Sequence, residues 1–146
     1  FLHGKLLMRP RNIFTYGSLM YAEVWQDIVK LPYENQTAWL DGFRRTYILG
    51  DQYPVVLPRA GQKNLQGVVY FSVKEQDIAR LDRFEGEHYY RRRVRPTIKV
   101  DGEPKIIEAD VYVLKPKFAD LATLRPWDPD FFAEHKIKQF RRAYRP

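Results

Sequence analysis

Glu85 is the residue whose type and position most directly suggest chemistry. Ile78, Leu81 and Glu85 are spaced i, i+3, i+7, so they share one face of a predicted helix. A carboxylate on that apolar face turns inward, and it stands at the negative end of the helix, just before Gly86. Both settings disfavour ionisation, so we expect a raised pKa for Glu85. Such a carboxylate suits general acid/base work near neutral pH.

Periodicity alone leaves a second interpretation of Glu85 open. The side chain would then lie at a frayed helix end, where it reaches solvent or pairs with an arginine of the run Arg91–Arg93. Glu87 follows the predicted helix end and is expected at the surface. The spacing therefore nominates Glu85 without excluding a purely structural role.

The turn Tyr16-Gly17-Ser18-Leu19 is the second candidate, as a substrate-binding segment. It joins a predicted strand to a predicted helix, so its backbone N–H groups could bind a carboxylate or an oxyanion. Gly17 permits close approach of a ligand. Ser18 could equally be a simple helix cap. Taken alone, the turn is a weak motif.

Other kinds of active site find little support in the sequence. The absence of cysteine removes thiol catalysis, disulfides and thiolate metal sites. His88 and His135 have no partners at metal-binding spacing, and no glycine-rich phosphate loop is present. Ser18 lacks the Gly-x-Ser-x-Gly elbow of serine hydrolases. We therefore expect no metal.

The first half of the chain contains one helical segment among strands. Tyr21, Val24, Trp25 and Ile28 mark one face of a helix that Pro32 ends. Strands are predicted at 11–16, 39–40, 47–49, 55–57 and 65–73. Gly67, inside the last of these, indicates a bulge or a close backbone approach.

The second half adds a helix, a hairpin and a closing helix. Ser72-Val73-Lys74-Glu75 predicts a capping box that opens a helix ending near Phe84. Two strands, 90–100 and 104–114, are predicted around a turn at Asp101-Gly102. Asp128-Pro129 predicts the start of a last helix, whose apolar stripe comprises Ala133, Ile137, Phe140 and Tyr144.

These elements predict one α+β domain with a mixed sheet or barrel, because strands dominate and about three helices accompany them. The length of 146 residues suits a single domain, which we assign to 9–146. Residues 1–8 are set apart as a flexible or vector-derived N-terminus, with Met8 as a possible initiator.

The net charge of +7 raises the question of nucleic acid as a partner. The excess lies in Arg91–Arg93 with Arg95, and in a C-terminal group made of Lys136, Lys138, Arg141, Arg142 and Arg145. Neither cluster matches a nucleic-acid module, so we expect a solvated basic face. No apolar run is long enough to span a membrane, and the cysteine-free chain suits a cytoplasmic location.

Three segments together resemble the gamma-glutamylcyclotransferase-like superfamily. They are the strand entering Tyr16-Gly17-Ser18-Leu19, then Leu81-Asp82-Arg83-Phe84-Glu85-Gly86, then Tyr90-Arg91-Arg92-Arg93-Val94. Tyr53-Pro54-Val55-Val56 and Gly67-Val68-Val69-Tyr70 are similar to the branch of gamma-glutamylamine cyclotransferases and plant avirulence-induced-gene-like proteins. The ending from Trp127-Asp128 to Phe140 resembles the plant tail, so the likeness runs from about Asn12 to Tyr144.

The resemblance implies a mixed-strand barrel with flanking helices and a cavity beside the turn at 16–19. It implies that Glu85 is the catalytic acid/base and that Tyr16, Gly17, Ser18 and Leu19 bind a small gamma-glutamyl substrate. Family enzymes, acyltransferases or lyases by class, release 5-oxoproline by intramolecular attack and need no cofactor. Tyr16, Tyr53 and Tyr90 could line the pocket or simply pack in the core, and Tyr89 competes for the family's tyrosine position.

Three hypotheses follow for the function. The first is a cyclotransferase that acts on a gamma-glutamyl amine or peptide. The second is a non-catalytic small-molecule-binding or stress-response protein of the same fold. The third, a nucleic-acid binder, rests on charge alone. An inward carboxylate favours the first, and the sequence identifies neither the gamma-glutamyl compound nor the oligomeric state.

Overall fold

A mixed sheet of seven strands forms the main body of the protein. The computed structural model describes residues 10–51 and 53–143. The strands of this sheet are β1 (Arg11–Thr15), β2 (Asn35–Leu40), β5 (Leu65–Val73), β6 (Tyr89–Val94), β7 (Thr97–Val100), β8 (Glu103–Ile106) and β9 (Ala109–Leu114). Their spatial order is β6-β9-β1-β5-β2-β7-β8. β1 pairs in parallel with β9 and antiparallel with β5, so the sheet is mixed.

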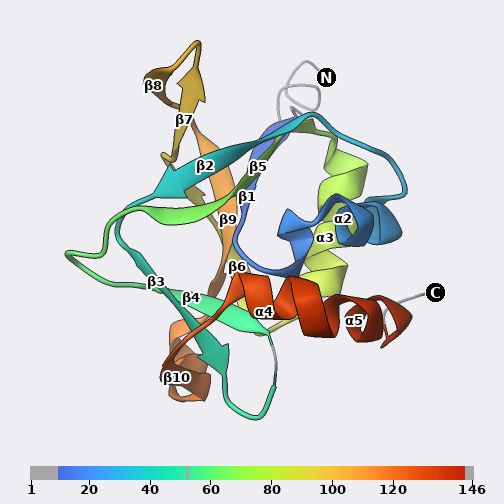
Figure 1. The fold of residues 1–146 in the computed structure, drawn as a ribbon, viewed down its shortest axis with the longest axis vertical. Coiled ribbons are helices and arrows are strands. Elements are labelled where there is room, and N and C mark those ends of the chain that lie inside the picture. The colour runs from blue at the N-terminus through green and yellow to red at the C-terminus, as the bar shows by residue number, and fades with distance from the viewer. Residues whose placement is uncertain (1–9, 52, 144–146) are drawn as a thin grey trace, which may run out of the picture.

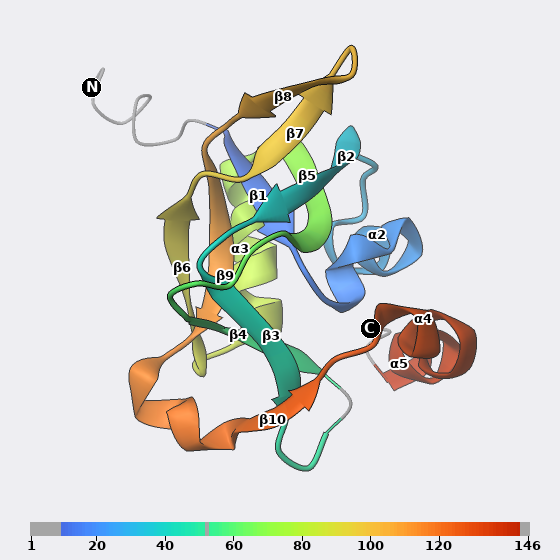
Figure 2. The ribbon, with the colours of Figure 1, turned by 60° about the vertical axis from the view of Figure 1, so that its left-hand side comes forward.

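A second sheet of three antiparallel strands lies beside the first. Its order is β10 (Ala122–Pro126), β3 (Phe43–Ile48) and β4 (Pro54–Pro58). The large sheet curls strongly, and Figures 1 and 2 show β3 and β4 continuing below it. Within the described residues the two sheets do not close into a complete barrel. The fold class is α+β, with a mixed sheet and flanking helices, as the sequence predicts.

The helices of the protein do not all lie together: most gather on one side of the curled sheet, and the one at Pro116–Leu121 lies beside β10 (Figure 1). They are the 3-10 helix η1 (Ser18–Met20), α2 (Ala22–Val29), α3 (Glu75–Glu85), the 3-10 helix η2 (Pro116–Leu121), and the C-terminal series α4 (Pro129–Phe131), π-helix η3 (Phe132–Lys136) and α5 (Ile137–Ala143). None of these helices has the length and apolar composition needed to cross a membrane. α2 and α3 pack on the sheet, whereas the C-terminal helices cross in front of it in the view of Figure 1 and lie to one side of it in Figure 2.

Successive residues of the central strands point to opposite faces of the sheet, and those on each face form a hydrophobic core. Ile13 of β1 joins the core shared with the helices, whereas its neighbour Phe14 joins the core inside the curl. Tyr70 and Val69 of β5 divide in the same way. β9 is buried at all six positions because both of its faces are covered.

Most of the predicted elements are confirmed, with shifted boundaries. The hairpin at Asp101-Gly102 joins β7 and β8, and both residues have the positive φ of a two-residue turn, 53° and 81°. The strand at 65–73 is also confirmed. A Cβ on Gly67 would lie 2.2 Å from the carbonyl oxygen of Thr15, so the close backbone approach is real. Asp128 caps α4 by accepting from the N–H groups of Asp130 and Phe131.

Two predictions about the second half need correction. The capping box is wrong: Ser72 lies in β5 with φ of 53°, its N–H donates to Asn12 Oδ1, and the helix begins after Lys74 without a side-chain cap. Acidic residues in the first turn, Glu75 and Asp77, favour that helix start instead. The long strands 90–100 and 104–114 are each divided in two, and Pro96 lies at the first break.

The expectations for residues 1–8 and for Tyr144 lie outside the described residues.

Candidate functional site

The turn after β1 presents a row of backbone N–H groups. The Met20 N–H donates to the carbonyl of Gly17 (3.0 Å), and the Tyr21 N–H donates to that of Ser18 (3.2 Å), which forms η1. Within the described part of the chain, no acceptor pairs with the N–H groups of Gly17, Ser18 and Leu19. Ser18 is buried and makes no side-chain cap, so its alternative role as a helix cap is not observed.

Neighbouring strands hold this turn in place. The Tyr16 hydroxyl donates to the backbone carbonyl of Tyr112 on β9 (2.7 Å), which anchors the start of the turn to the sheet. A Cβ on Gly17 would lie 2.7 Å from Cγ of Pro54 at the start of β4. Gly17 therefore serves close packing against a neighbouring proline, a use that its sequence context alone did not indicate.

Glu85 occupies the last position of α3. Gly86 follows with φ of 81°, and its N–H donates to the carbonyl of Asp82, so the helix stops there as predicted. The Glu85 side chain is half-buried and lines a cavity. Burial, and secondarily the negative charge of Asp82 one turn earlier, raise the pKa of Glu85 to about 8. The predicted rise is confirmed, although sequence reasoning assigned the second contribution to the helix dipole.

The nearby arginines pair with other carboxylates. Arg91 Nε lies 2.8 Å from Asp82 and its Nη1 lies 2.9 Å from Asp110, while Arg93 bridges Asp110 and Glu108. Among the ion pairs of the described residues, none includes Glu85. The alternative in which Glu85 is neutralised by the run Arg91–Arg93 is therefore not what the structure shows.

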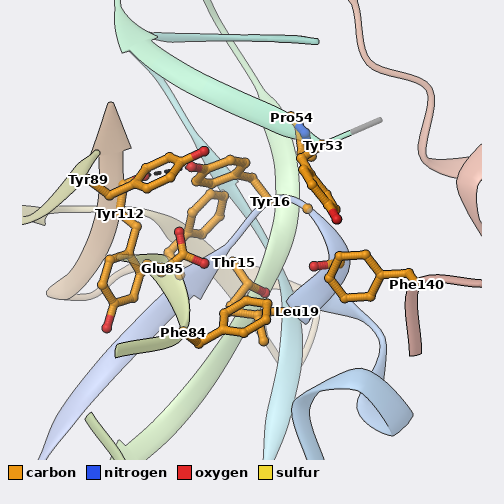
Figure 3. A pocket seen from close by; sticks show the side chains of 13 residues that line it. Thr15, Tyr16, Leu19, Tyr53, Pro54, Phe84, Glu85, Tyr89, Tyr112 and Phe140 are labelled. Carbon is orange, nitrogen blue, oxygen red and sulfur yellow. Dashed lines mark hydrogen bonds between the residues drawn. The ribbon is translucent and has the colours of Figure 1, made fainter. Parts of the chain in front are cut away.

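The turn and Glu85 meet at one cavity of about 140 Å³. Figure 3 shows the Glu85 side chain reaching into a space ringed by aromatic side chains, with Tyr53 and Phe140 opposite Tyr89 and Tyr112. The lining residues are Phe14, Thr15, Tyr16, Gly17, Ser18, Leu19, Tyr53, Pro54, Phe84, Glu85, Tyr89, Tyr112 and Phe140. Segments nearly seventy residues apart in sequence thus form one site.

The tyrosine candidates separate in the structure. Tyr16 and Tyr53 line the cavity, whereas Tyr90 packs against the core inside the curl and Tyr89 takes the lining position. Burial raises the pKa of Tyr16 well above its usual range, with smaller contributions from Glu85 and Tyr89. Tyr16 is therefore a neutral wall of the cavity across the working pH range.

A polar network behind Glu85 was missed by sequence reasoning. The Tyr112 hydroxyl donates to Asp82 Oδ1 (2.6 Å), the oxygen that also accepts from Arg91, and Arg91 continues to the buried Asp110. Arg11 is a further partner of Asp110 (3.3 Å). One available signal was the i, i+3 spacing of Asp82 and Glu85. The pairing across strands could be found only in three dimensions.

The two histidines that sequence reasoning weighed stay apart from this site. His88 packs beside Phe118 and His135 beside Phe131. Among the described residues, no three His, Cys, Asp or Glu side chains cluster in a way that could hold a metal ion.

A comparison with protein families decides the relationship. A family described as "Gamma-glutamyl cyclotransferase, AIG2-like" matches residues 13–129, a segment that contains both the turn and Glu85. The chain belongs to this family. The fold and the candidate site of this chain are therefore to be compared with those of the gamma-glutamyl cyclotransferase, AIG2-like family.

Curated and structural relatives agree with this assignment. AIG2-like protein C of Arabidopsis thaliana is 28% identical over 130 residues, which cover 89% of this chain and 69% of the relative. A solution structure of another Arabidopsis thaliana protein has a TM-score of 0.67 at 24% identity, covering 92% and 87% of the two chains. A yeast gamma-glutamyl cyclotransferase specific to glutathione has a TM-score of 0.56 at 14% identity, with coverage of 94% and 89%. At these identities the structural likenesses show a shared family fold.

Proposed function

We propose that this protein is an enzyme that cleaves a gamma-glutamyl amine or peptide by intramolecular cyclisation and releases 5-oxoproline. The observation that carries the proposal is the raised pKa of Glu85, about 8, in the cavity that the turn at 16–19 also lines. Membership of the gamma-glutamyl cyclotransferase, AIG2-like family supports the same reaction.

Glu85 is proposed as the proton shuttle. The ionised carboxylate takes a proton from the substrate's α-ammonium, and the freed amine attacks the γ-carbonyl carbon. The ring closes, Glu85 returns its proton to the leaving nitrogen, and the bond from that carbon to this nitrogen breaks. Glu85 then takes the second proton from the new ring nitrogen and passes it to the departed amine, so the products are 5-oxoproline, with a neutral lactam, and an ammonium group. The carboxylate is regenerated and every proton is accounted for. A carboxyl group with a pKa near neutrality can do both steps efficiently.

The turn is proposed to bind the substrate's oxygen atoms. The N–H groups of Gly17, Ser18 and Leu19 have no described acceptor, so they can donate to a carboxylate or to the oxyanion that forms at the γ-carbonyl. Such donors lose little in reorganisation because the strand and η1 hold them in place. No group of the protein needs to form a covalent bond with the substrate in this scheme.

The size and lining of the cavity suit the gamma-glutamyl portion of a substrate. Its volume of about 140 Å³ is smaller than the roughly 300–1,000 Å³ of pockets that enclose drug-sized ligands. We therefore propose that the cavity encloses the part that cyclises, whereas the leaving amine extends toward the opening. Aromatic walls from Tyr53, Tyr89 and Phe140 exclude water from the reacting atoms.

A direct test is a screen of gamma-glutamyl amines, gamma-glutamyl dipeptides and glutathione for release of 5-oxoproline. We expect release from at least one class, and Glu85→Gln to lower kcat by about 10² or more because the amide cannot accept a proton. Glu87→Gln is the matched control, since Glu87 is exposed and lies beyond the helix end. Binding of these compounds without any release would favour the non-catalytic alternative.

A further inference from the structure

Arg45 is a half-buried cation that holds the turn from outside the cavity. Its Nη1 donates to the carbonyl oxygen of Tyr16 (2.8 Å) and to that of Gln66 (3.2 Å). Its guanidinium lies over the ring of Trp127, 5.3 Å from the centroid. Arg45 borders a separate cleft of about 320 Å³ and does not line the cavity that contains Glu85. It therefore touches the turn on a side other than the one a substrate would occupy.

No carboxylate neutralises this guanidinium among the described residues. The ion pairs of the described chain do not include Arg45, and the nearby Asp128 uses its side chain to cap α4. Burial lowers the pKa of Arg45, but an arginine remains protonated at working pH. Partial burial of an unpaired charge has a free-energy cost, and here two backbone carbonyls and a ring offset it.

Because the peptide bond is planar, the position of Arg45 determines the direction of the Gly17 N–H. The described chain has no cis peptide bond, so the Tyr16 C=O and the Gly17 N–H point in opposite directions. A guanidinium that holds the carbonyl oxygen also fixes the direction of this N–H, away from Arg45. Gly17 lines the cavity, and its N–H has no described acceptor.

We propose that Arg45 is a positioning residue, which holds the Tyr16–Gly17 peptide so that the Gly17 N–H donates to a substrate oxygen in the cavity. This inference rests on the proposed function for its catalytic consequence. A cation bonded to the carbonyl also polarises the amide, which makes its N–H a stronger donor. Arg45 acts through the backbone of the turn and does not contact the substrate.

The test uses Arg45→Met, which keeps an unbranched apolar stem over Trp127 but removes the charge and the donors. Arg45→Lys is the conservative variant, because one ammonium can reach the carbonyl of Tyr16. Arg44→Met is the matched control: Arg44 lies on the same strand, borders the same cleft and donates to the carbonyl of Leu124 (2.7 Å) rather than to the turn. Each protein is first checked for a cooperative thermal transition.

Two readouts are then compared at a temperature well below that transition. We expect Arg45→Met to lower kcat/KM for 5-oxoproline release about tenfold or more, Arg45→Lys to recover part of the loss, and Arg44→Met to stay within about twofold of wild type. We also expect the Gly17 amide ¹H–¹⁵N signal to shift in Arg45→Met and to stay in place in Arg44→Met.

The two readouts separate this inference from the proposed function. If the wild-type protein releases no 5-oxoproline, the proposed function fails, and the Gly17 amide signal still decides whether Arg45 fixes that peptide. If the signal does not move in Arg45→Met, or if Arg44→Met loses as much activity, the positioning role of Arg45 is wrong.

Discussion

The ionisation of Glu85 is linked to the stability of the fold. Burial raises the pKa of its carboxyl group to about 8 from an ordinary value of 4.5, so the folded state holds this proton more tightly than the unfolded chain. Ionising Glu85 therefore costs stability. That cost is absent below pH 4.5, grows as the pH rises and is complete above about pH 8.

Replacing Glu85 with glutamine removes this cost, because the amide keeps the shape of the neutral acid. We expect Glu85→Gln to be more stable than wild type at pH 8.5 and indistinguishable from it at pH 4. Urea unfolding midpoints at the two pH values measure the difference. Glu87→Gln, at an exposed position, should change the free energy of unfolding by less than about 0.5 kcal/mol at either pH. A variant that is less stable only at high pH would mean that the ionised Glu85 stabilises the fold.

At the scale of the element, α3 raises the pKa of Glu85 through the charge of Asp82. The negative charge of Asp82 favours the neutral form of Glu85, and Asp82 also occupies Arg91. Asp82→Asn removes the charge and leaves Arg91 less neutralised, and both effects lower the pKa of Glu85. Because the wild-type rate should rise with pH through about 8, we expect the acidic limb of kcat/KM to move to lower pH in this variant.

The pH profile of Asp82→Asn is best read beside that of Glu87→Gln. Both changes remove one negative charge close to the end of α3, but the raised pKa of Glu85 comes from burial and from Asp82, and Glu87 does not contribute to it. The control should therefore keep the wild-type limb. An unchanged limb in Asp82→Asn would mean that burial alone sets the pKa of Glu85.

The contact between the turn and β4 gives a second prediction at this scale. Gly17 has φ of −129°, so its place in the turn does not depend on a positive φ, and what the structure shows against a side chain there is a packing limit. A Cβ there would lie 2.7 Å from Cγ of Pro54. We expect Gly17→Ala to destabilise the protein by about 1–3 kcal/mol.

A double-mutant cycle identifies the cause of that loss. Pro54→Ala removes the contacted Cγ, so Gly17→Ala should cost clearly less in the Pro54→Ala background than in wild type. Urea unfolding of the four proteins provides the coupling energy. Additive losses would show that the turn resists an added methyl group for some other reason.

At the scale of the whole molecule, local sequence rules predicted the elements better than their assembly. Short apolar runs located β1 and β5, and Asp101-Gly102 located the hairpin, because these signals act between near neighbours. The capping box failed since Asn12 from another strand holds the Ser72 N–H and keeps Ser72 in β5. A local motif cannot report a competing partner sixty residues away.

The residues of the candidate site also divide into those that local sequence rules predicted and those that only the assembled fold shows. The inward face of Glu85 followed from helical spacing, whereas the residues around it came from distant segments. Phe140, Tyr112 and Arg91 carried no local signal of proximity to Glu85, whereas Asp82 had one in its i, i+3 spacing. The partners of the basic runs could not be predicted from the sequence either. Only the fold shows that Arg141 is bonded to Asp27 and that Arg91 is bonded to two carboxylates.

The cavity joins the two ends of the described chain, so its integrity should depend on the C-terminal helices. Phe140 of α5 lines it together with the turn at 16–19, and its ring packs against Tyr53, Phe84 and Phe132 at centroid distances of 5.3, 6.3 and 5.6 Å. Phe140→Ala removes a buried aromatic ring and one wall of the cavity. We expect a loss of about 3 kcal/mol in the free energy of unfolding and a raised KM for the gamma-glutamyl substrate.

The control for this prediction is Phe131→Ala, because Phe131 is 42% exposed and lies outside the cavity. It should change KM little and stability by less than about 0.5 kcal/mol. Unfolding curves and steady-state kinetics at 20 °C separate the two effects, because Phe140→Ala remains folded there if the wild type has ordinary stability. Suppose Phe140→Ala loses stability but keeps the wild-type KM. The C-terminal helices then brace the fold without shaping the site, and the water exclusion proposed for the cavity must come from Tyr53 and Tyr89.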